Sequence, residues 1–533
     1  MVSEKRHYLR QDVQVDPLIN NWYAWIQIIP PISSVFNILH RQLKVMKSYL
    51  KSPDLHEKAI KNPAFKGGSF LNIDKSKRGF IEELLEKTRE KSAYQKKFVE
   101  AVRTLDKLLL EDVKGYTLQE IYPEIPDILR GYVELYYDRH HRADFRFYEH
   151  LLYDTPLYDE TEQSILLQLF QGDTQRPFVF STPRIPGKNS VELKVKFNHK
   201  ALDLLFEMKS SPKSLSEVKT ALGCKIENEE VFNSFFTLEE PEKRAEYLNS
   251  SPRIRYFGHA CVLVETAGKS VLIDPFIPYE SNSGIPRFSY KDLPDFIDCV
   301  LITHGHHDHI LLETLLQLRH KIGKVVVPSN LNGEIQDPSL SLMLAKLGFS
   351  KVQKIDDLES FEVGPIEITG IPFLGEHHDL HVFTKICYHL RIGDRTILFA
   401  ADSCNFGHGI YDRIKSKLGK IDLLFVGMEC DGAPVSWVYG PIFTIKPERD
   451  ADRSRRGRGS NCDETLAMVE LFECSAVYVY AMGAEPWVQY ILDVEYTDNS
   501  NPIVESNKLV SKCLENNIHS ERLFGKSEII LSS

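Results

Sequence analysis

The stretch Thr303-His304-Gly305-His306-His307-Asp308-His309 places five potential metal ligands within seven positions of this 533-residue sequence. The apolar run 299–302 before it predicts a buried strand, and a second apolar run, 310–312, follows it. Side chains that leave the end of a buried strand are held in place by the sheet, which favours a defined site over a solvated histidine-rich loop. We therefore predict a metal centre here, because imidazole and carboxylate groups are common metal ligands.

The spacing within this stretch indicates two metal ions. His304 and His306 are two positions apart, so in extended backbone their side chains point to the same side. Asp308 and His309 follow closely enough to reach a neighbouring ion. The stretch thus predicts a dinuclear site.

The surroundings of the stretch predict layered sheets. Helical segments lie between some of the runs, and strands that alternate with helices favour sheets covered by helices. The short β-rich runs after Pro252 are 255–257, 261–266, 270–273, 299–303 and 325–327.

The first half of the chain is helix-rich. From Tyr94 to Leu109 apolar residues recur every three or four positions, which predicts an amphipathic helix. Residues 191–197 alternate like a strand, and helical patterns continue to about Tyr247. The composition changes at 249–252. We therefore expect two domains, 1–250 and 251–533, since 533 residues exceed one ordinary core.

The distribution of charge argues against nucleic acid as a partner. Residues 1–250 hold 37 Lys and Arg against 37 Asp and Glu, while residues 251–533 hold 28 against 38. The second half thus carries the whole net charge of −10. Proteins that bind nucleic acid normally present a basic face to the phosphates.

Cysteine usage and hydropathy indicate a soluble cytoplasmic protein. The nine cysteines are widely spaced and form no Cys-x-x-Cys pair, which is atypical of a disulfide framework or a zinc ribbon. The polar stretch 1–10 does not resemble a signal peptide. The apolar stretch 22–39 is interrupted by Gln27, Pro30 and Pro31, so we expect a buried segment and no membrane span.

His304 to His309 match the pattern His-x-His-x-Asp-His. In this motif the sequence resembles the metallo-β-lactamase superfamily, whose signature has the same pattern. The stretches 255–260 and 271–275 are similar to the opening strands of that superfamily, and 399–402 is similar to the strand that ends in its bridging aspartate, here Asp402. The resemblance covers roughly residues 253–490. It implies an αββα sandwich, preceded here by a helix-rich mixed α/β N-terminal domain, with a dinuclear site at one edge of the sheets.

One position departs from the hydrolases of this superfamily. They place a histidine between the first motif and the bridging aspartate, whereas this sequence has Gly375-Glu376-His377-His378-Asp379 there. The non-haem diiron β-hydroxylases of nonribosomal peptide biosynthesis use glutamate at this point. The chain also resembles that branch in its long N-terminal domain, in 16–25 and in Met482-Gly483-Ala484-Glu485-Pro486-Trp487.

This resemblance implies a ligand set for two iron ions, joined by an oxo or hydroxo bridge. Three imidazoles and three carboxylates suit iron, because hard oxygen donors with imidazole favour it over zinc. His377 or His378 is the alternative ligand, with Glu376 then orienting it. In the implied set Glu376 is also the catalytic candidate. The implied ligands are His304, His306 and Glu376 for one iron, Asp308 and His309 for the other, and Asp402 between them.

The resemblance also implies an activity and its partners. The reaction is an O2-dependent β-hydroxylation of an amino acid tethered through phosphopantetheine to a carrier domain of a nonribosomal peptide synthetase, as in antibiotic biosynthesis. Electrons come from an external donor, a reductase or ferredoxin. A homodimer is expected, with residues 1–250 serving dimerisation or carrier docking.

Two other functional classes compete with this hypothesis. A dizinc or dimanganese hydrolase of a phosphodiester, lactone or thioester fits the 303–309 motif, and Glu376 argues against it. A non-catalytic scaffold is disfavoured by the complete ligand set.

Several further groups have two interpretations each. Glu429 and Glu485 either face the site or lie on the surface, and for Glu485 the surface is favoured. The histidines at 140, 141 and 150 are better explained by a tyrosine-rich packing surface than by a metal site. The five arginines at 449, 453, 455, 456 and 458 form either a solvated loop or a latch for a carrier domain or the pantetheine phosphate.

Overall fold

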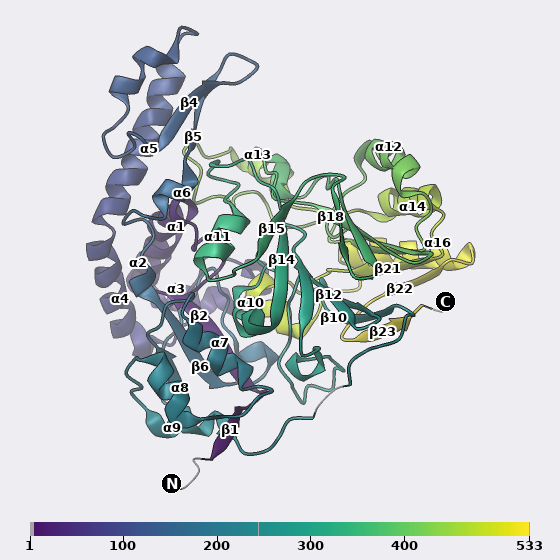
Figure 1. Cartoon of the computed structure of the whole chain (residues 1–533). Coiled ribbons are helices and arrows are strands. Elements are labelled where there is room, and N and C mark those ends of the chain that lie inside the picture. Colours follow the sequence, from purple (N-terminus) through teal and green to yellow (C-terminus); the bar gives the residue numbers. More distant parts are fainter. Residues whose placement is uncertain (1–4, 243–244, 532–533) are drawn as a thin grey trace.

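The computed structural model describes residues 5–242 and 245–531, and its centre is a sandwich of two mixed seven-stranded sheets (Figure 1). In sheet order, the first consists of β15 (Val352–Ile355), β14 (Ile322–Pro328), β13 (Ile297–Leu301), β12 (Lys269–Ile273), β11 (Cys261–Thr266), β10 (Arg253–Gly258) and β23 (Ser527–Ile530). The second consists of β16 (Ser360–Val363), β17 (Ile366–Ile371), β18 (Cys387–Ile392), β19 (Arg395–Phe399), β20 (Leu423–Gly427), β21 (Ala476–Tyr480) and β22 (His519–Arg522).

The strands pack through alternate side chains. Val262 and Val264 of β11 share one buried cluster with Leu390 of β18 and Phe399 of β19, so this core lies between the sheets. The opposite faces are covered by helices. On the first sheet these are α10 (Leu312–Leu318) and α11 (Leu340–Lys346); on the second they are α12 (Gly409–Leu418), α14 (Cys462–Phe472) and α16 (Asn501–Glu515). The predicted αββα fold class is confirmed.

The N-terminal half adds smaller sheets and, among the described residues, the longest helix, α5 (Ala93–Glu111; Figure 1). Its strands are β1 (Arg6–Leu9), β2 (Val13–Ile19), β3 (Trp22–Tyr23), β4 (Val133–Tyr137), β5 (Ala143–Phe147), β6 (Gln163–Leu169), β7 (Ser190–Leu193), β8 (Lys213–Ser214) and β9 (Phe236–Thr237). Its helices are α1 (Pro31–Asn37), α2 (Leu43–Lys51), α3 (Pro53–Ile60), α4 (Arg78–Lys91), α5 (Ala93–Glu111), α6 (Glu149–Leu152), α7 (Lys200–Glu207), α8 (Leu215–Leu222) and α9 (Glu229–Ser234).

The two halves share a continuous core. Val15 of β2 belongs to the same buried cluster as Leu272 of β12. Arg176, from the N-terminal half, forms ion pairs with Asp16 at 2.5 Å and with Glu313 of α10 at 2.7 Å, all three nearly inaccessible. Removing one partner of a buried ion pair destabilises a protein by about 3–5 kcal/mol. These two ion pairs therefore hold the N-terminal half against the second half of the chain. The domain boundary near residue 250 stays a prediction.

Most of the elements expected from the sequence are present. Helix α5 contains the predicted helix, and β10, β11, β12 and β14 contain four of the predicted β-rich runs. The fifth run, 299–303, extends two residues past β13, which ends at Leu301. The strand expected at 191–197 is β7, which ends at Leu193. Trp22, Trp25 and their apolar neighbours are buried, as expected. No helix in residues 5–242 and 245–531 combines the length and apolar character of a membrane span.

Candidate metal centre

Two strand ends deliver metal ligands to one edge of the sandwich. His304 and His309 follow β13 of the first sheet, and Asp402 follows β19 of the second. The ligand atoms of these three buried residues all lie within 4.8 Å of one another. The strand positions predicted from the sequence thus converge in space.

Asp274 fixes the rings of two of these histidines. Its Oδ2 accepts hydrogen bonds from His309 Nδ1 at 2.8 Å and from Thr303 Oγ1 at 2.6 Å. Because the Thr303 hydroxyl donates to Asp274, it accepts from His304 Nδ1 at 3.0 Å. Both histidines therefore carry their proton on Nδ1 and keep Nε2 as a lone-pair donor beside Asp402.

Asp308 is held in a similar way by His259. His259 Nδ1 accepts a hydrogen bond from the Gly483 amide at 3.1 Å, so its proton lies on Nε2 and is donated to Asp308 Oδ2 at 2.9 Å. His259, Asp308 and His309 form a second group whose ligand atoms lie within 4.8 Å of one another. His259 uses Nε2 as a donor, so it positions Asp308 instead of binding a metal itself.

His306 and Glu376 are arranged differently. His306 Nδ1 pairs directly with Glu376 Oε1 at 2.9 Å, and neither residue belongs to the two tight groups. Four consecutive residues from Glu376 to Asp379 have positive φ angles of 51°, 44°, 58° and 58°. Such backbone is strained for residues other than glycine, at about 1–3 kcal/mol each, and is often found at functional sites. The Arg458 amide donates to Glu376 Oε2 at 2.9 Å and supports this loop.

The two histidines after Glu376 have other partners. His377 Nδ1 hydrogen-bonds the Tyr439 hydroxyl at 2.9 Å, and this hydroxyl also lies 3.3 Å from His306 Nε2. His378 Nε2 donates to the Ala433 carbonyl at 3.0 Å. Both rings thus hold the loop in place beside the metal ligands.

The electrostatics follow from burial and from these pairs. Burial acts against charge on both His306 and Glu376, but their mutual attraction outweighs it, which raises the pKa of His306 and lowers the pKa of Glu376. Burial, with the neighbouring Asp402 carboxylate, raises the pKa of Glu429 well above its usual value. Burial also raises the pKa of Asp402. The site thus concentrates carboxylates that a cation would neutralise.

The donor atoms fit a metal centre. His304 Nε2 and Asp402 Oδ1 are buried and make no hydrogen bond within the described residues, which is costly for polar atoms unless another ligand satisfies them. Imidazole nitrogens and carboxylate oxygens are the donors that iron accepts in proteins. The residues therefore fit two metal ions of the expected kind.

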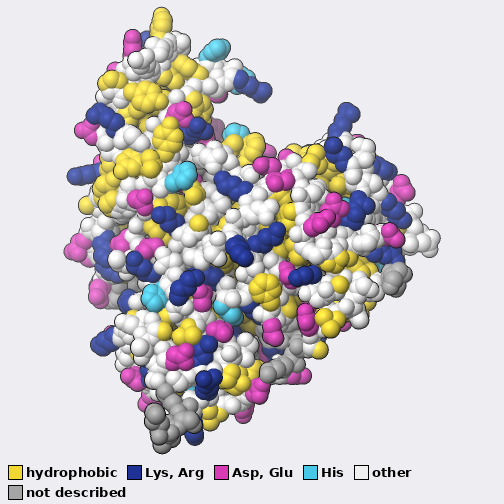
Figure 2. Space-filling view, viewed as in Figure 1, with side chains coloured by type: hydrophobic (Ala, Val, Ile, Leu, Met, Phe, Trp, Pro, Cys, Tyr) yellow, Lys and Arg dark blue, Asp and Glu magenta, His cyan; other side chains and the backbone are white. Residues whose placement is uncertain are grey.

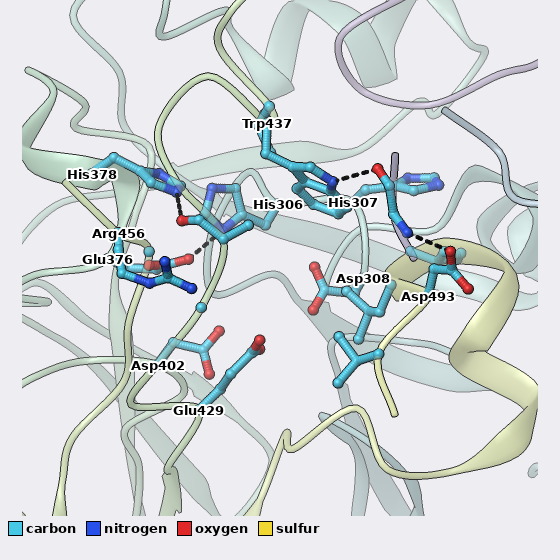
Figure 3. A pocket seen from close by; sticks show the side chains of 18 of the residues that line it. His306, His307, Asp308, Glu376, His378, Asp402, Glu429, Trp437, Arg456 and Asp493 are labelled. Carbon is cyan, nitrogen blue, oxygen red and sulfur yellow. Dashed lines mark hydrogen bonds and ion pairs between the residues drawn. The ribbon is translucent and has the colours of Figure 1, made fainter. Parts of the chain in front are cut away.

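A pocket of about 350 Å³ opens onto these ligands (Figure 3). We call it the metal-site pocket. Figure 3 shows the carboxylates of Asp308, Asp402 and Glu429 near one another, with Trp437 and His307 at the other side. His307 itself makes no hydrogen bond among the described residues and packs against Tyr23, Trp25 and Phe180, so it belongs to the aromatic wall.

The other residues that the sequence singled out lie in different environments. Glu429 lines the metal-site pocket, so it faces the site. The favoured surface position of Glu485 is wrong, because this side chain is 1% exposed and accepts a 2.5 Å hydrogen bond from Tyr256. The histidines at 140, 141 and 150 are exposed, and neither group of metal-ligating side chains found in the described residues includes them.

The arginine-rich segment is divided between two environments. Helix α13 (Arg449–Ser454) carries the exposed Arg449 and Arg453. Arg456 and Arg458 line the metal-site pocket. The segment thus combines exposed arginines with arginines that line a pocket.

Sequence reasoning missed the residues that orient the ligands. Asp274, His259 and Tyr439 each contact a proposed ligand or its neighbour. Asp274 follows a predicted strand, as the ligands do, and His259 follows a glycine at a strand end, so strand-end position was the available signal. No local pattern marks Tyr439.

The fold and site define a metallo-β-lactamase-fold protein with a dinuclear metal centre, and comparisons with known proteins agree. A family model described as a beta-lactamase superfamily domain matches residues 253–440, and the diiron non-heme beta-hydroxylase N-terminal domain matches residues 8–241.

Matches over nearly the whole length of the chain identify the family more narrowly. A 4-amino-L-phenylalanyl-[CmlP-peptidyl-carrier-protein] 3-hydroxylase from Streptomyces venezuelae is 36% identical over 97% of this chain and 98% of its own length. The crystal structure of CmlA, a diiron β-hydroxylase from Streptomyces venezuelae, matches 99% of this chain and 100% of that chain with a TM-score of 0.92 and 35% identity. A UPF0173 protein from Pyrococcus abyssi is 28% identical over 33% of this chain and 69% of its own length. The chain belongs to the family of non-haem diiron β-hydroxylases.

Proposed function

We propose that this diiron β-hydroxylase acts on an amino acid tethered as a thioester to the carrier domain of a nonribosomal peptide synthetase. The supporting observation is the pairing of Glu376 with His306 beside the metal-site pocket, where metallo-hydrolases of this fold use a histidine. The Streptomyces venezuelae relative acts on an aminoacyl group attached to a peptidyl carrier protein, as its name states.

We further propose ligand roles for the six residues. His304, His306 and Glu376 would hold one iron, Asp308 and His309 would hold the other, and Asp402 would serve both. When bound, the two irons supply O2 activation and C–H oxidation, with electrons from an external reductase or ferredoxin. In this scheme Glu376 is the catalytic candidate, and it lines the pocket that admits the amino acid.

The residues of the pocket have separate tasks in this reaction. Trp25, Phe180 and Trp437 give an apolar wall that packs against the substrate side chain and excludes water. Asp274 and His259 keep their ligands in one protonation state through the hydrogen bonds described above. A pocket of about 350 Å³ accommodates one amino-acid side chain and the end of its tether.

The test is an assay on iron-loaded protein with a panel of aminoacyl-loaded carrier domains. With O2 and a reductant, one loaded carrier should gain one oxygen atom in mass, and none should do so when O2 is withheld. Two irons per chain without hydroxylation of any carrier would contradict the substrate class. Turnover that proceeds without O2 would point to a hydrolase.

We also propose that residues 1–250 support dimer formation. Apolar side chains are exposed on α5 and on the segments around the β4–β5 hairpin, including Leu110, Tyr116 and Tyr122 at 68%, 79% and 40%. Figure 2 shows apolar surface gathered on the part of the molecule formed by α5 and the β4–β5 hairpin. Exposed apolar patches of this kind often mark interfaces. Leu110→Glu with Tyr116→Ser should convert a dimer to a monomer in sedimentation velocity, and an unchanged mass would count against it.

A further inference from the structure

A second cavity, of about 750 Å³, adjoins the metal-site pocket. The two share Gly67, Phe180, Pro434 and Trp437 as walls. We call it the basic pocket because of the side chains that line it. Its basic residues are His40, Arg41, Lys44, Arg103, Lys446 and Arg449.

The positive charges of the basic pocket are not neutralised by carboxylates. Asp452 is the acidic residue that lines it, and its oxygens accept from the Ser436 amide and hydroxyl at 2.9 and 2.8 Å. Within the described residues, none of Lys44, Arg103 or Lys446 forms an ion pair with a carboxylate. Burial, and then repulsion from Lys446 and Arg103, lowers the pKa of Lys44. The cluster therefore carries an excess of positive charge that a bound anion would neutralise.

The wall of this pocket is built from contacts across the two halves. A π-helical turn, Ile38–Gln42, joins α1 to α2, and such turns are rare and frequent at functional sites. It presents His40, whose Nδ1 lies 2.6 Å from the Pro441 carbonyl, and Arg41, which donates to the Trp437 carbonyl at 2.6 Å. Arg41 thus ends on carbonyls and on the Trp25 and Phe180 rings, 5.6 and 5.2 Å away, without a carboxylate.

The arginines of the metal-site pocket differ in this respect. Arg456 pairs with Asp431 at 2.9 Å, and Arg458 pairs with Glu464 at 2.5 Å. Their charges are already compensated, whereas Lys44, Arg103 and Lys446 pair with no carboxylate in the part of the chain that the structure describes. A tethered substrate with one anionic group would therefore place that group in the basic pocket and its uncharged end in the metal-site pocket.

We propose that the basic pocket binds the phosphate of a phosphopantetheine arm, while the aminoacyl end of the arm enters the metal-site pocket. This inference rests on the proposed function, because carrier domains hold their acyl groups on that arm. Charge complementarity supports the phosphate, and the four shared wall residues place the two pockets side by side. A phosphate that contacts several ammonium and guanidinium groups gains charge-assisted hydrogen bonds.

The first experiment measures binding of free ligands to the iron-loaded full chain by titration calorimetry. 4′-Phosphopantetheine should bind about tenfold or more tightly than pantetheine, the value expected for one or two charge-assisted hydrogen bonds. Equal affinities for the two would overturn the proposal. Inorganic phosphate that binds as tightly as phosphopantetheine would also overturn it, because the pocket would then be a general anion site.

Matched variants test the location of the phosphate. Lys44→Glu with Lys446→Glu should abolish the preference for 4′-phosphopantetheine and leave pantetheine binding unchanged. Lys47→Glu is the control, since Lys47 is exposed on the same helix α2 and does not line the pocket. A preference that survives the double variant, or that is lost equally in Lys47→Glu, would refute the assignment.

Carrier domains with and without the arm separate the phosphate from the carrier's own acidic residues. The double variant should weaken binding of the arm-bearing carrier by about tenfold or more and leave the arm-free carrier unaffected. Equal weakening for both would assign the cations to carrier side chains and overturn the proposal. Binding is measured without turnover, so failure of hydroxylation in the carrier panel would be distinguishable from failure of this inference.

Discussion

The two halves of the proposed metal centre are supported in different ways. The rear half comprises His304, Asp308, His309 and Asp402, and the ends of strands deliver these side chains. The front half comprises His306 and Glu376, and Glu376 lies in a loop with four consecutive positive φ angles. Strand ends thus place one half of the proposed ligand set, whereas a strained loop places Glu376, a carboxylate of the other half.

The strongest way to break the rear half is His309→Ala. This ring is a proposed ligand of one iron, its Nδ1 is held by Asp274 and its Nε2 lies 3.0 Å from Asp402 Oδ2, so its loss should remove that iron. We expect iron content to fall clearly below two per chain and hydroxylation to fall more than about 100-fold, beyond the usual effect of a residue that only orients a ligand. Metal analysis and single-turnover assays check this. Full retention of two irons would contradict the proposed role of His309 as a ligand.

Asp274→Asn tests whether orientation alone matters in the rear half. The neutral amide accepts less strongly from His309 Nδ1 and Thr303, so iron affinity should fall about 10–100-fold. Iron loss to a chelator, followed over time, gives the measurement. Asp298→Asn is the control, because Asp298 accepts from Ser270 on the same sheet and its bonds lie away from the ligands. Equal iron loss in both variants would indicate general destabilisation.

Gly457→Ala tests the front half, because it disturbs the loop that carries Glu376. A methyl group there would lie 2.9 Å from His378 Nε2 and 3.2 Å from Glu376 Oε1, so the loop must shift. We expect about tenfold slower hydroxylation with iron content nearly unchanged, since small misplacements near the chemistry are costly. Gly409→Ala, where a methyl group meets nothing within 4 Å, is the control. Loss of iron from Gly457→Ala would mean that the two halves are not separable.

Tyr439→Phe should have the smallest effect. It removes one hydroxyl that contacts His377 Nδ1 and His306 Nε2, worth about 1 kcal/mol or roughly fivefold in rate. The loss should appear in kcat more than in KM, because the hydroxyl holds ligands. A change confined to KM would instead assign Tyr439 to substrate binding.

Much of the rear half was predictable from the sequence, and less of the front half was. His304 to His309 follow a buried strand, so their local spacing already implied their geometry. Glu376 was recognised through resemblance, and the local sequence left His377 and His378 as rivals. Those two rings hydrogen-bond the Tyr439 hydroxyl and the Ala433 carbonyl, which lie more than 50 positions away in the sequence.

The sequence by itself indicated layered sheets and the candidate ligands of 303–309, because strand periodicity and close ligand spacing are local properties. Its resemblance to a known family added the αββα sandwich and the candidate ligands Glu376 and Asp402. The tertiary structure alone decided which histidine nitrogens are free, that Glu485 is buried, and that His40, Lys44 and Lys446 share one cavity. These features depend on contacts between distant segments. Burial, ion pairing and pocket shape arise there, and no local pattern encodes them.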